Sequence, residues 1–76
     1  MKYIELSDSQ TGQPVYINVD AVNAIYTDVD MRCSAVDVQS GVLFVNEDAR
    51  TILNTLYAAN YDQGFLFKAP LKKDGD

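Results

Sequence analysis

The sequence predicts an α+β domain in which a small antiparallel sheet of about five strands is covered by one C-terminal amphipathic helix. Before Asn46, apolar residues recur at every second position, which is the period of a half-buried strand. After Asn46, they recur at helical spacing, at Ala49, Ile52, Leu53 and Leu56. This change of period within a chain of 76 residues indicates a single domain whose strands come first.

A hairpin is predicted at the start of the chain. The run 8–13 consists of turn-forming residues, and its Gly12 can adopt a positive φ. When the chain folds about this loop, Leu6 faces Val15 and Ile4 faces Ile17. One register therefore gathers all four apolar side chains on one face, and this is how a register is specified.

A second hairpin is predicted around Ser40-Gly41, which has the composition of a two-residue loop. This loop would pair Val38 with Leu43 and Val36 with Val45. Between the hairpins, we expect a single helical turn capped by Asp20, a strand over 24–27, a turn over 28–30 and a strand over 31–38.

The helix is expected to begin at Asn46, a favourable N-cap residue, and to run to about Asn60. Glu47 and Asp48 would then lie at the positive end of the helix dipole. Gly64 is a plausible break after the helix. We place the domain at residues 1–67 and interpret 68–76 as a charged, disordered tail.

Composition argues against several classes of partner. The chain has 11 acidic and 6 basic residues, for a net charge of −5, so phosphate backbones would be repelled and no nucleic acid partner is expected. The longest uncharged run, 51–61, is too short and too polar to span a bilayer, and no secretory signal is recognisable. With a single cysteine, the sequence favours a cytoplasmic protein that has no membrane contact.

No catalytic, cofactor-binding or metal-binding motif is found. The chain lacks histidine, the commonest general acid–base residue and the usual activator of a nucleophile. Cys33 falls inside a strand pattern and is interpreted as structural. Asp28 and Asp30 resemble the start of a calcium loop, but the sixth position is Cys33 where that loop needs glycine. We therefore predict no catalytic residue, no cofactor and no metal.

Aromatic residues cluster near the C-terminus and form the candidate interface. Aromatic side chains are enriched at the cores of protein–protein interfaces, and they are equally suited to packing inside a small domain. The sequence leaves both readings open. The candidate interface residues are Tyr57, Tyr61, Phe65, Leu66 and Phe67.

Residues 6–56 contain a pattern of short motifs: Tyr16-Ile17-Asn18, the apolar pair Val22 and Ile25, a hairpin centred on Gly41, and Val45-Asn46-Glu47 leading into a helix. In this pattern the chain resembles the small FlbD/SwrD-type motility proteins found near bacterial flagellar genes. The resemblance implies a short sheet with one helix and a role in motility that is not understood as catalysis. The loop over 8–13 is longer than in that pattern, the aromatic segment after Tyr61 is additional, and no functional residues carry over.

The sequence favours a non-catalytic protein-interaction module of bacterial or phage origin that binds a protein partner or itself. One alternative is a small enzyme or ligand-binding domain without a recognisable motif, and the missing histidine argues against the enzyme. Another is an acidic inhibitor that mimics nucleic acid, for which a charge of −5 is modest.

Overall fold

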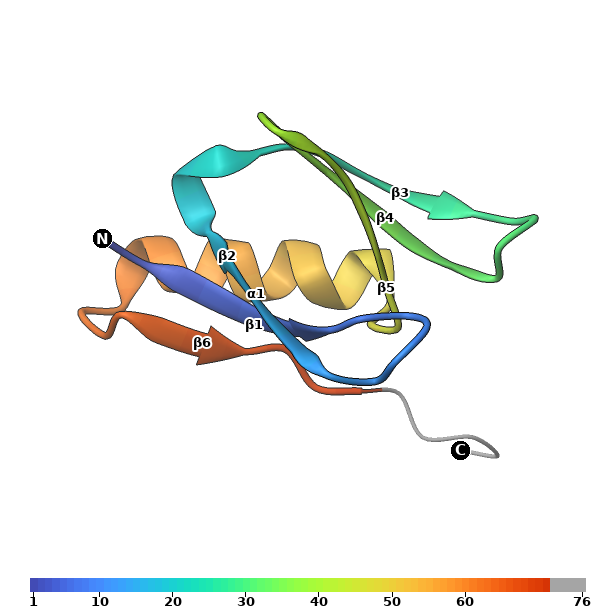
Figure 1. Ribbon diagram of the computed structural model, residues 1–76. Helices are drawn as coiled ribbons and strands as arrows, with labels where there is room; N and C mark the ends of the chain where they lie inside the picture. The colour runs from blue at the N-terminus through green and yellow to red at the C-terminus, as the bar shows by residue number, and fades with distance from the viewer. Residues whose placement is uncertain (72–76) are drawn as a thin grey trace.

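The computed structural model describes residues 1–71, and these form six strands, one short 3-10 helix and one α-helix (Figure 1). In chain order the elements are β1 (Tyr3–Ser7), β2 (Pro14–Asn18), η1 (Val19–Ala21), β3 (Val22–Asp28), β4 (Cys33–Val38), β5 (Gly41–Val45), α1 (Ala49–Tyr61) and β6 (Leu66–Lys68). The α+β class is confirmed, with antiparallel pairing and one covering α-helix. Two three-stranded sheets replace the expected single sheet, and β6 follows the helix.

The first sheet has the order β2-β1-β6, with β1 in the centre. Its β1–β2 hairpin has the predicted register, in which Ile4 lies opposite Ile17 and Leu6 opposite Val15. In the loop, Gly12 adopts a φ of +75°, which only glycine reaches without strain. The third strand, β6, pairs with β1 in parallel, a pairing that the sequence analysis did not foresee.

The second sheet has the order β3-β4-β5, and its β4–β5 hairpin corrects the predicted register by two residues. Val38 lies opposite Gly41 and Val36 opposite Leu43, so the two-residue loop is 39–40. Gly41 opens β5 with a φ of +153°, a conformation that other residues rarely adopt. A shift of two preserves side-chain parity, so the predicted apolar face of the hairpin survives.

The segment between the hairpins also differs in detail from the prediction. Asn18, not Asp20, caps the short helix η1, and its side-chain oxygen accepts the Asp20 N–H at 2.9 Å. The connecting strand β3 is longer than predicted and contains an irregularity between Val22 and Ala24. The turn that follows β3 extends to Arg32, which has a φ of +54°.

One edge of β1 joins the two sheets. The Tyr3 N–H donates to the Phe65 carbonyl at 2.8 Å, within the β6 pairing. Further along β1, the Ser7 carbonyl accepts the Asn46 N–H at 2.9 Å, just after β5. Beyond the end of β1, the Ser9 N–H donates to the Phe44 carbonyl at 2.9 Å. The same edge therefore binds β6 at its start and β5 at its end.

Glu47 fills the gap between these two pairings. Its Oε1 atom accepts the Ser7 N–H at 2.8 Å, and only 2% of the residue is exposed. A side-chain carboxylate thus completes the backbone ladder of β1 where neither strand reaches it. Glu47 was expected from the sequence at the positive end of the helix dipole, and in the structure it lies in this junction instead.

The helix begins later than predicted, because Asn46 is held by the end of β1. Asn46 Nδ2 donates to the Asp8 carbonyl at 3.2 Å, and Asp48 acts as the N-cap instead, accepting the Arg50 N–H at 3.1 Å. At the other end, the Lys2 ammonium group donates to the carbonyls of Ala59 and Asp62. A cation at the last carbonyls of a helix is favourable, so the start of the chain holds the end of α1.

The core lies where the inner faces of the two sheets meet α1 (Figure 1). Its buried members come from both sheets, from the helix and from the segment after β6: Ile4, Leu6, Ile17, Val36, Val45, Ile52 and Ala69. Phe67 packs against this cluster. Lys68 belongs to β6 and Ala69 is buried, so the folded part extends past the predicted boundary at Phe67. Residues 72–76 of the predicted tail lie outside the described residues.

Glu47→Ala should destabilise the fold, because the part-buried Ser7 N–H would lose its hydrogen-bond partner. The expected loss in the free energy of unfolding is about 1–3 kcal/mol. Glu47→Gln retains an acceptor oxygen and should lose less. Urea titrations of the two variants and the wild type check this, and a wild-type midpoint for Glu47→Ala would contradict it.

Asp8 organises the first loop and generates a prediction about pH. Its Oδ2 accepts the Thr11 N–H at 2.9 Å, the Thr11 hydroxyl at 3.0 Å and the Gln10 N–H at 3.1 Å. The hydrogen bonds from Thr11, with a smaller contribution from the Gln10 N–H, lower the pKa of Asp8 below its ordinary value of 3.8. The stabilisation by Asp8 is therefore fully present above pH 3.8 and is lost as the pH falls through the lowered pKa.

Asp8→Asn should accordingly be less stable than the wild type at pH 7, and the difference should narrow as the pH falls below the ordinary pKa of 3.8. Thermal melts of both proteins across this range measure the difference. A gap that stays constant with pH would show that the Asp8 charge does not contribute.

Candidate protein-docking groove

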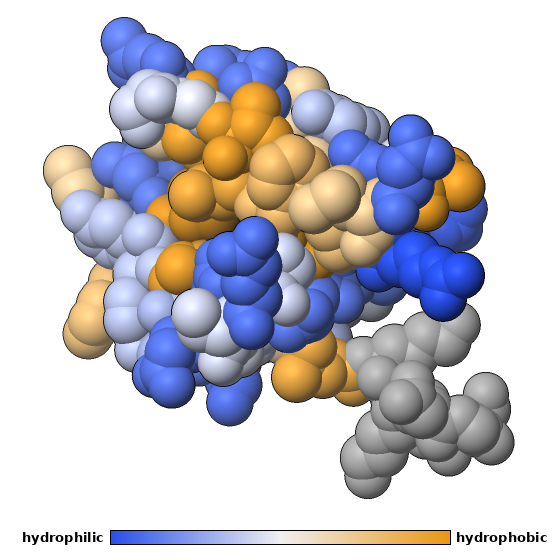
Figure 2. Space-filling model, turned by 45° about the vertical axis from the view of Figure 1, so that its right-hand side comes forward, coloured by the Kyte–Doolittle hydropathy of each residue, from blue (hydrophilic) through white to orange (hydrophobic). Residues whose placement is uncertain are grey.

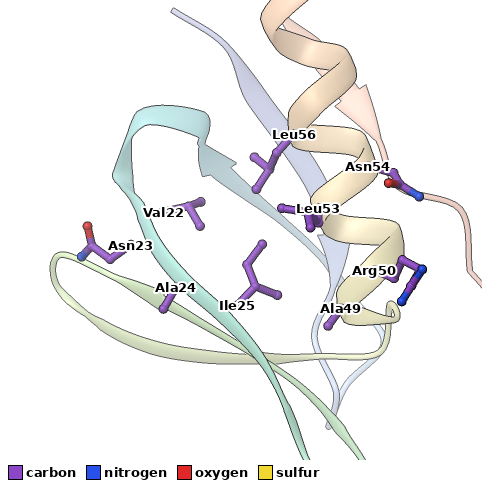
Figure 3. A pocket seen from close by; sticks show the side chains of 9 residues that line it. All are labelled: Val22, Asn23, Ala24, Ile25, Ala49, Arg50, Leu53, Asn54 and Leu56. Carbon is purple, nitrogen blue, oxygen red and sulfur yellow. The ribbon is translucent and has the colours of Figure 1, made fainter.

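An open apolar groove lies between β3 and α1 (Figure 3). Figure 3 shows Val22 and Ile25 of β3 and Leu53 and Leu56 of α1 pointing toward the space between the two elements. The Arg50 side chain is drawn on the side of α1 that faces away from β3, and Arg50 also belongs to the groove lining. We call this feature the β3–α1 groove; it has a volume of about 720 Å³ and is lined by Val22, Asn23, Ala24, Ile25, Ala49, Arg50, Leu53, Asn54 and Leu56.

The groove exists because α1 does not bury its whole apolar face. Ile52 is fully buried against the sheets, whereas Leu53, the next residue, is 60% exposed. Successive residues of a helix differ by about 100° in direction, so the two side chains cannot both face the core. Val22, Ile25 and Leu56 are only partly buried at the margin of the core. Leu53 therefore continues the core outward as an accessible apolar surface.

The apolar surface continues along the helix. Leu53, Tyr57 and Tyr61 are spaced four residues apart, so they follow one another along one side of α1. All three are more than half exposed. The two tyrosine rings pack together with centroids 5.0 Å apart and an interplanar angle of 54°. These three residues, which we call the helix ridge, lie beside the groove and share Leu53 with it.

Figure 2 shows hydrophobic side chains gathered on one face of the molecule, with hydrophilic side chains around them. A contiguous apolar patch on a small domain marks an interaction surface more often than scattered exposed residues do.

The groove is bordered by strand β3, which lies at the end of its sheet and pairs only with β4 among the described residues. The other edge of β3 is therefore unpaired within residues 1–71.

The five predicted interface residues do not form one surface. Tyr57 and Tyr61 stand on the helix ridge. Phe65 and Leu66 are exposed at the start of β6, beside Tyr3 and Tyr16 of the first sheet. Phe67 instead packs against the core. The structure therefore brings Tyr57 and Tyr61 together, and places Phe65 with Leu66 on another part of the surface.

The groove residues were not identified as a site from the sequence. Leu53 and Leu56 were assigned to the covering face of the helix together with the buried Ile52, and Val22 and Ile25 were noted only as an apolar pair. The sequence carries no clear signal for the groove. Ile52, Leu53 and Leu56 span about 100° of the helix circumference, which is an ordinary width for a face that covers a core.

Acidic and cysteine side chains do not gather into a metal site among the described residues. Within residues 1–71, no group of three or more acidic, cysteine or histidine side chains is placed to hold a metal ion. Cys33 is half-buried at the start of β4 and its thiol is free. In the same part of the chain, no helix is long and apolar enough to cross a membrane. The groove has one charged side chain in its lining, Arg50.

Comparisons with known proteins supply no family: no family model, curated protein or solved structure matches the chain.

The exposure of the helix ridge generates a prediction about stability. Tyr57→Ser should change the free energy of unfolding by less than about 0.5 kcal/mol, because the side chain is mostly exposed. Ile52→Ala, five residues earlier on the buried side, should cost about 2–5 kcal/mol. Urea titrations of the two variants test this difference. Comparable losses would mean that Tyr57 belongs to the core.

Proposed function

We propose that the chain is a non-catalytic protein-interaction module that binds a hydrophobic segment of a partner protein in the β3–α1 groove. The observation that carries this proposal is the exposure of Leu53 beside Val22, Ile25 and Leu56. Full burial of a leucine side chain contributes about 1.5–3 kcal/mol, so an occupied groove would be favourable on this account alone.

The helix ridge enlarges the surface that a partner can cover. An aromatic side chain buries about 150–250 Å² when it is fully covered, and Tyr57 and Tyr61 are both exposed beside the groove. Tyrosine is frequent among residues that dominate binding energy, because its ring is apolar while its hydroxyl group can bind water or a partner. The groove and the ridge together suit a segment that has several apolar side chains.

Arg50 and Asn54 supply polar groups at the rim. A guanidinium group forms strong paired hydrogen bonds with carboxylates. The partner segment is therefore proposed to have an acidic residue at the end that lies near Arg50. The net charge of the whole chain is −5, which would repel a strongly acidic partner, so one or two acidic residues suit the site better than many.

The proposal includes no reaction. The chain has no histidine, and the groove lining contains no cysteine, serine or acidic side chain that could act as a nucleophile or a general base. A role in bacterial motility rests on the FlbD/SwrD-type sequence pattern alone. The protein-interaction proposal stands on the groove and does not depend on that family.

The test is a selection of peptides from a random library on the immobilised domain, followed by affinity measurements with Leu53→Lys and Val29→Lys. Val29 is an exposed apolar residue in the β3–β4 turn, outside the groove lining, so Val29→Lys is a matched control. Leu53→Lys should weaken binding by about 10–100-fold, the equivalent of one lost apolar contact. Val29→Lys should leave the affinity unchanged.

The binding position is measured in parallel by NMR. Amide signals of residues 22–25 and 49–56 should shift when a selected peptide is added. The proposal fails if no peptide binds, if the shifts fall elsewhere, or if the two lysine variants weaken binding equally.

A further inference from the structure

The outer edge of β6, which has no paired strand among the described residues, is a second surface suited to a partner. Along β1, Tyr3 donates its N–H to Phe65, and the Glu5 carbonyl accepts the Ala69 N–H at 3.2 Å. Because backbone groups point alternately to the two sides of a strand, Phe65, Phe67 and Ala69 face β1. Leu66 and Lys68 therefore direct their N–H and C=O groups away from β1, toward the edge.

No described element pairs with that edge. β6 ends the order β2-β1-β6, and Figure 1 shows it at the outer side of the first sheet. Leu66 is 47% exposed, and the Lys68 side chain is largely exposed. The edge opens onto a groove beside α1, in which the helix presents the small side chains of Thr51, Thr55 and Ala58. These residues leave room for another chain next to β6.

We propose that two copies of this chain associate by pairing their β6 strands in antiparallel orientation about a two-fold axis at Phe67. Leu66 of one copy would then lie opposite Lys68 of the other. In an antiparallel ladder, pairs joined by two hydrogen bonds alternate with pairs that have none. The two Leu66–Lys68 pairs are the bonded pairs, and the two Phe67 residues form the unbonded pair between them.

The direction of the backbone groups in β6 suits this symmetric pairing. Within β6, only Leu66 and Lys68 direct their backbone groups outward, and these are the two residues that the symmetry places in hydrogen-bonded pairs. Four hydrogen bonds result, and the two first sheets become one continuous six-stranded sheet. Pro70 stands at the next outward-facing position, where it has no N–H to donate, so the ladder ends where β6 ends.

Side chains on the outer face of the first sheet support a second copy as the occupant. Leu66 lies beside Tyr3 in register, and Lys68 lies beside Glu5 at 3.8 Å. In the pair of copies, the aliphatic part of Lys68 covers Leu66 of the other copy. The Lys68 charge stays with Glu5 of its own chain. The symmetric contact thus covers an exposed apolar side chain without placing two like charges opposite each other.

This association does not use the β3–α1 groove, so it stands or fails separately from the proposed function. The ladder is short and the contact is small, so we expect dimers at protein concentrations on the order of 0.1–1 mM. Two-fold symmetric dimers with self-complementary contacts are the commonest oligomers.

Sedimentation equilibrium of the whole chain tests the proposal. The wild type should approach the mass of a dimer in this range. Leu66→Pro removes an outward N–H that β1 does not use, and should weaken association at least about tenfold. Leu66→Ala retains the N–H and should remain closer to the wild type. Leu53→Lys, in the groove, should dimerise normally.

A register-specific cross-link keeps the test decisive if Leu66→Pro fails to fold. In a Cys33→Ser background, the double variant Leu66→Cys with Lys68→Cys places the cysteine at position 66 of one copy opposite the cysteine at position 68 of the other when the pairing is centred on Phe67. Pairings centred on position 66 or 68 would instead cross-link one of the single-cysteine variants. Oxidation should then give a disulfide-linked dimer, and each single cysteine should give far less. A wild type that stays monomeric at 1 mM would overturn the proposal. So would a folded double-cysteine variant that does not cross-link, or a dimer that Leu53→Lys disrupts and Leu66→Pro does not.

Discussion

The fold depends on how one edge of β1 is satisfied. Three different partners share that edge: β6 binds its first half, the Glu47 carboxylate binds Ser7, and the segment around Asn46 binds its end. A buried backbone N–H without a partner costs free energy comparable to a lost hydrogen bond, so the gap between β6 and β5 needs an acceptor. Glu47 provides it, and in doing so it holds the chain between β5 and α1 against the first sheet.

This junction determines the surfaces available for function. Because Glu47 and Asn46 are held at β1, α1 begins only at Ala49 and crosses the space between the two sheets (Figure 1). The helix then lies beside β3 on one side and beside β6 on the other, and both strands are at the ends of their sheets. The single α-helix leaves the outer edges of both β3 and β6 uncovered. The β3–α1 groove and the open edge of β6 result from this arrangement, and both suit recognition of another protein chain.

The alternation of apolar side chains predicted those parts of the fold in which it allows only one strand register. The β1–β2 register could be predicted because only one alignment puts Ile4, Leu6, Val15 and Ile17 on one face. In the second hairpin, two alignments that differ by two residues preserve the same face, so the apolar pattern could not choose between them. The structure has the alignment in which Gly41 opens β5. β6 was not predicted because a strand of three residues is too short to show an alternating apolar pattern. Its pairing partner β1 is also distant in sequence.

The candidate site was less predictable, because it depends on tertiary contacts. Glu47 has the sequence signature of a residue at the start of a helix, and nothing local distinguishes that role from a hydrogen bond to Ser7, forty residues away. Leu53 and Ile52 are equally apolar in sequence, and only the position of the sheets decides which one is buried. Tyr57 and Tyr61 were grouped from the sequence with three later residues as one candidate interface. The structure packs only these two rings together, as their spacing of four residues on a helix allows.

Amide hydrogen exchange at Ser7, followed by NMR at low protein concentration, tests the central claim most directly. If Glu47 completes the ladder of β1, the Ser7 amide should exchange as slowly as the amides of Ile4 and Leu6, which lie within the β1–β2 pairing. The Lys68 amide, which faces the open edge of β6, provides the unprotected reference within the same molecule. A Ser7 amide that exchanges as rapidly as that of Lys68 would contradict the account, because the junction that joins the two sheets would then be open in solution.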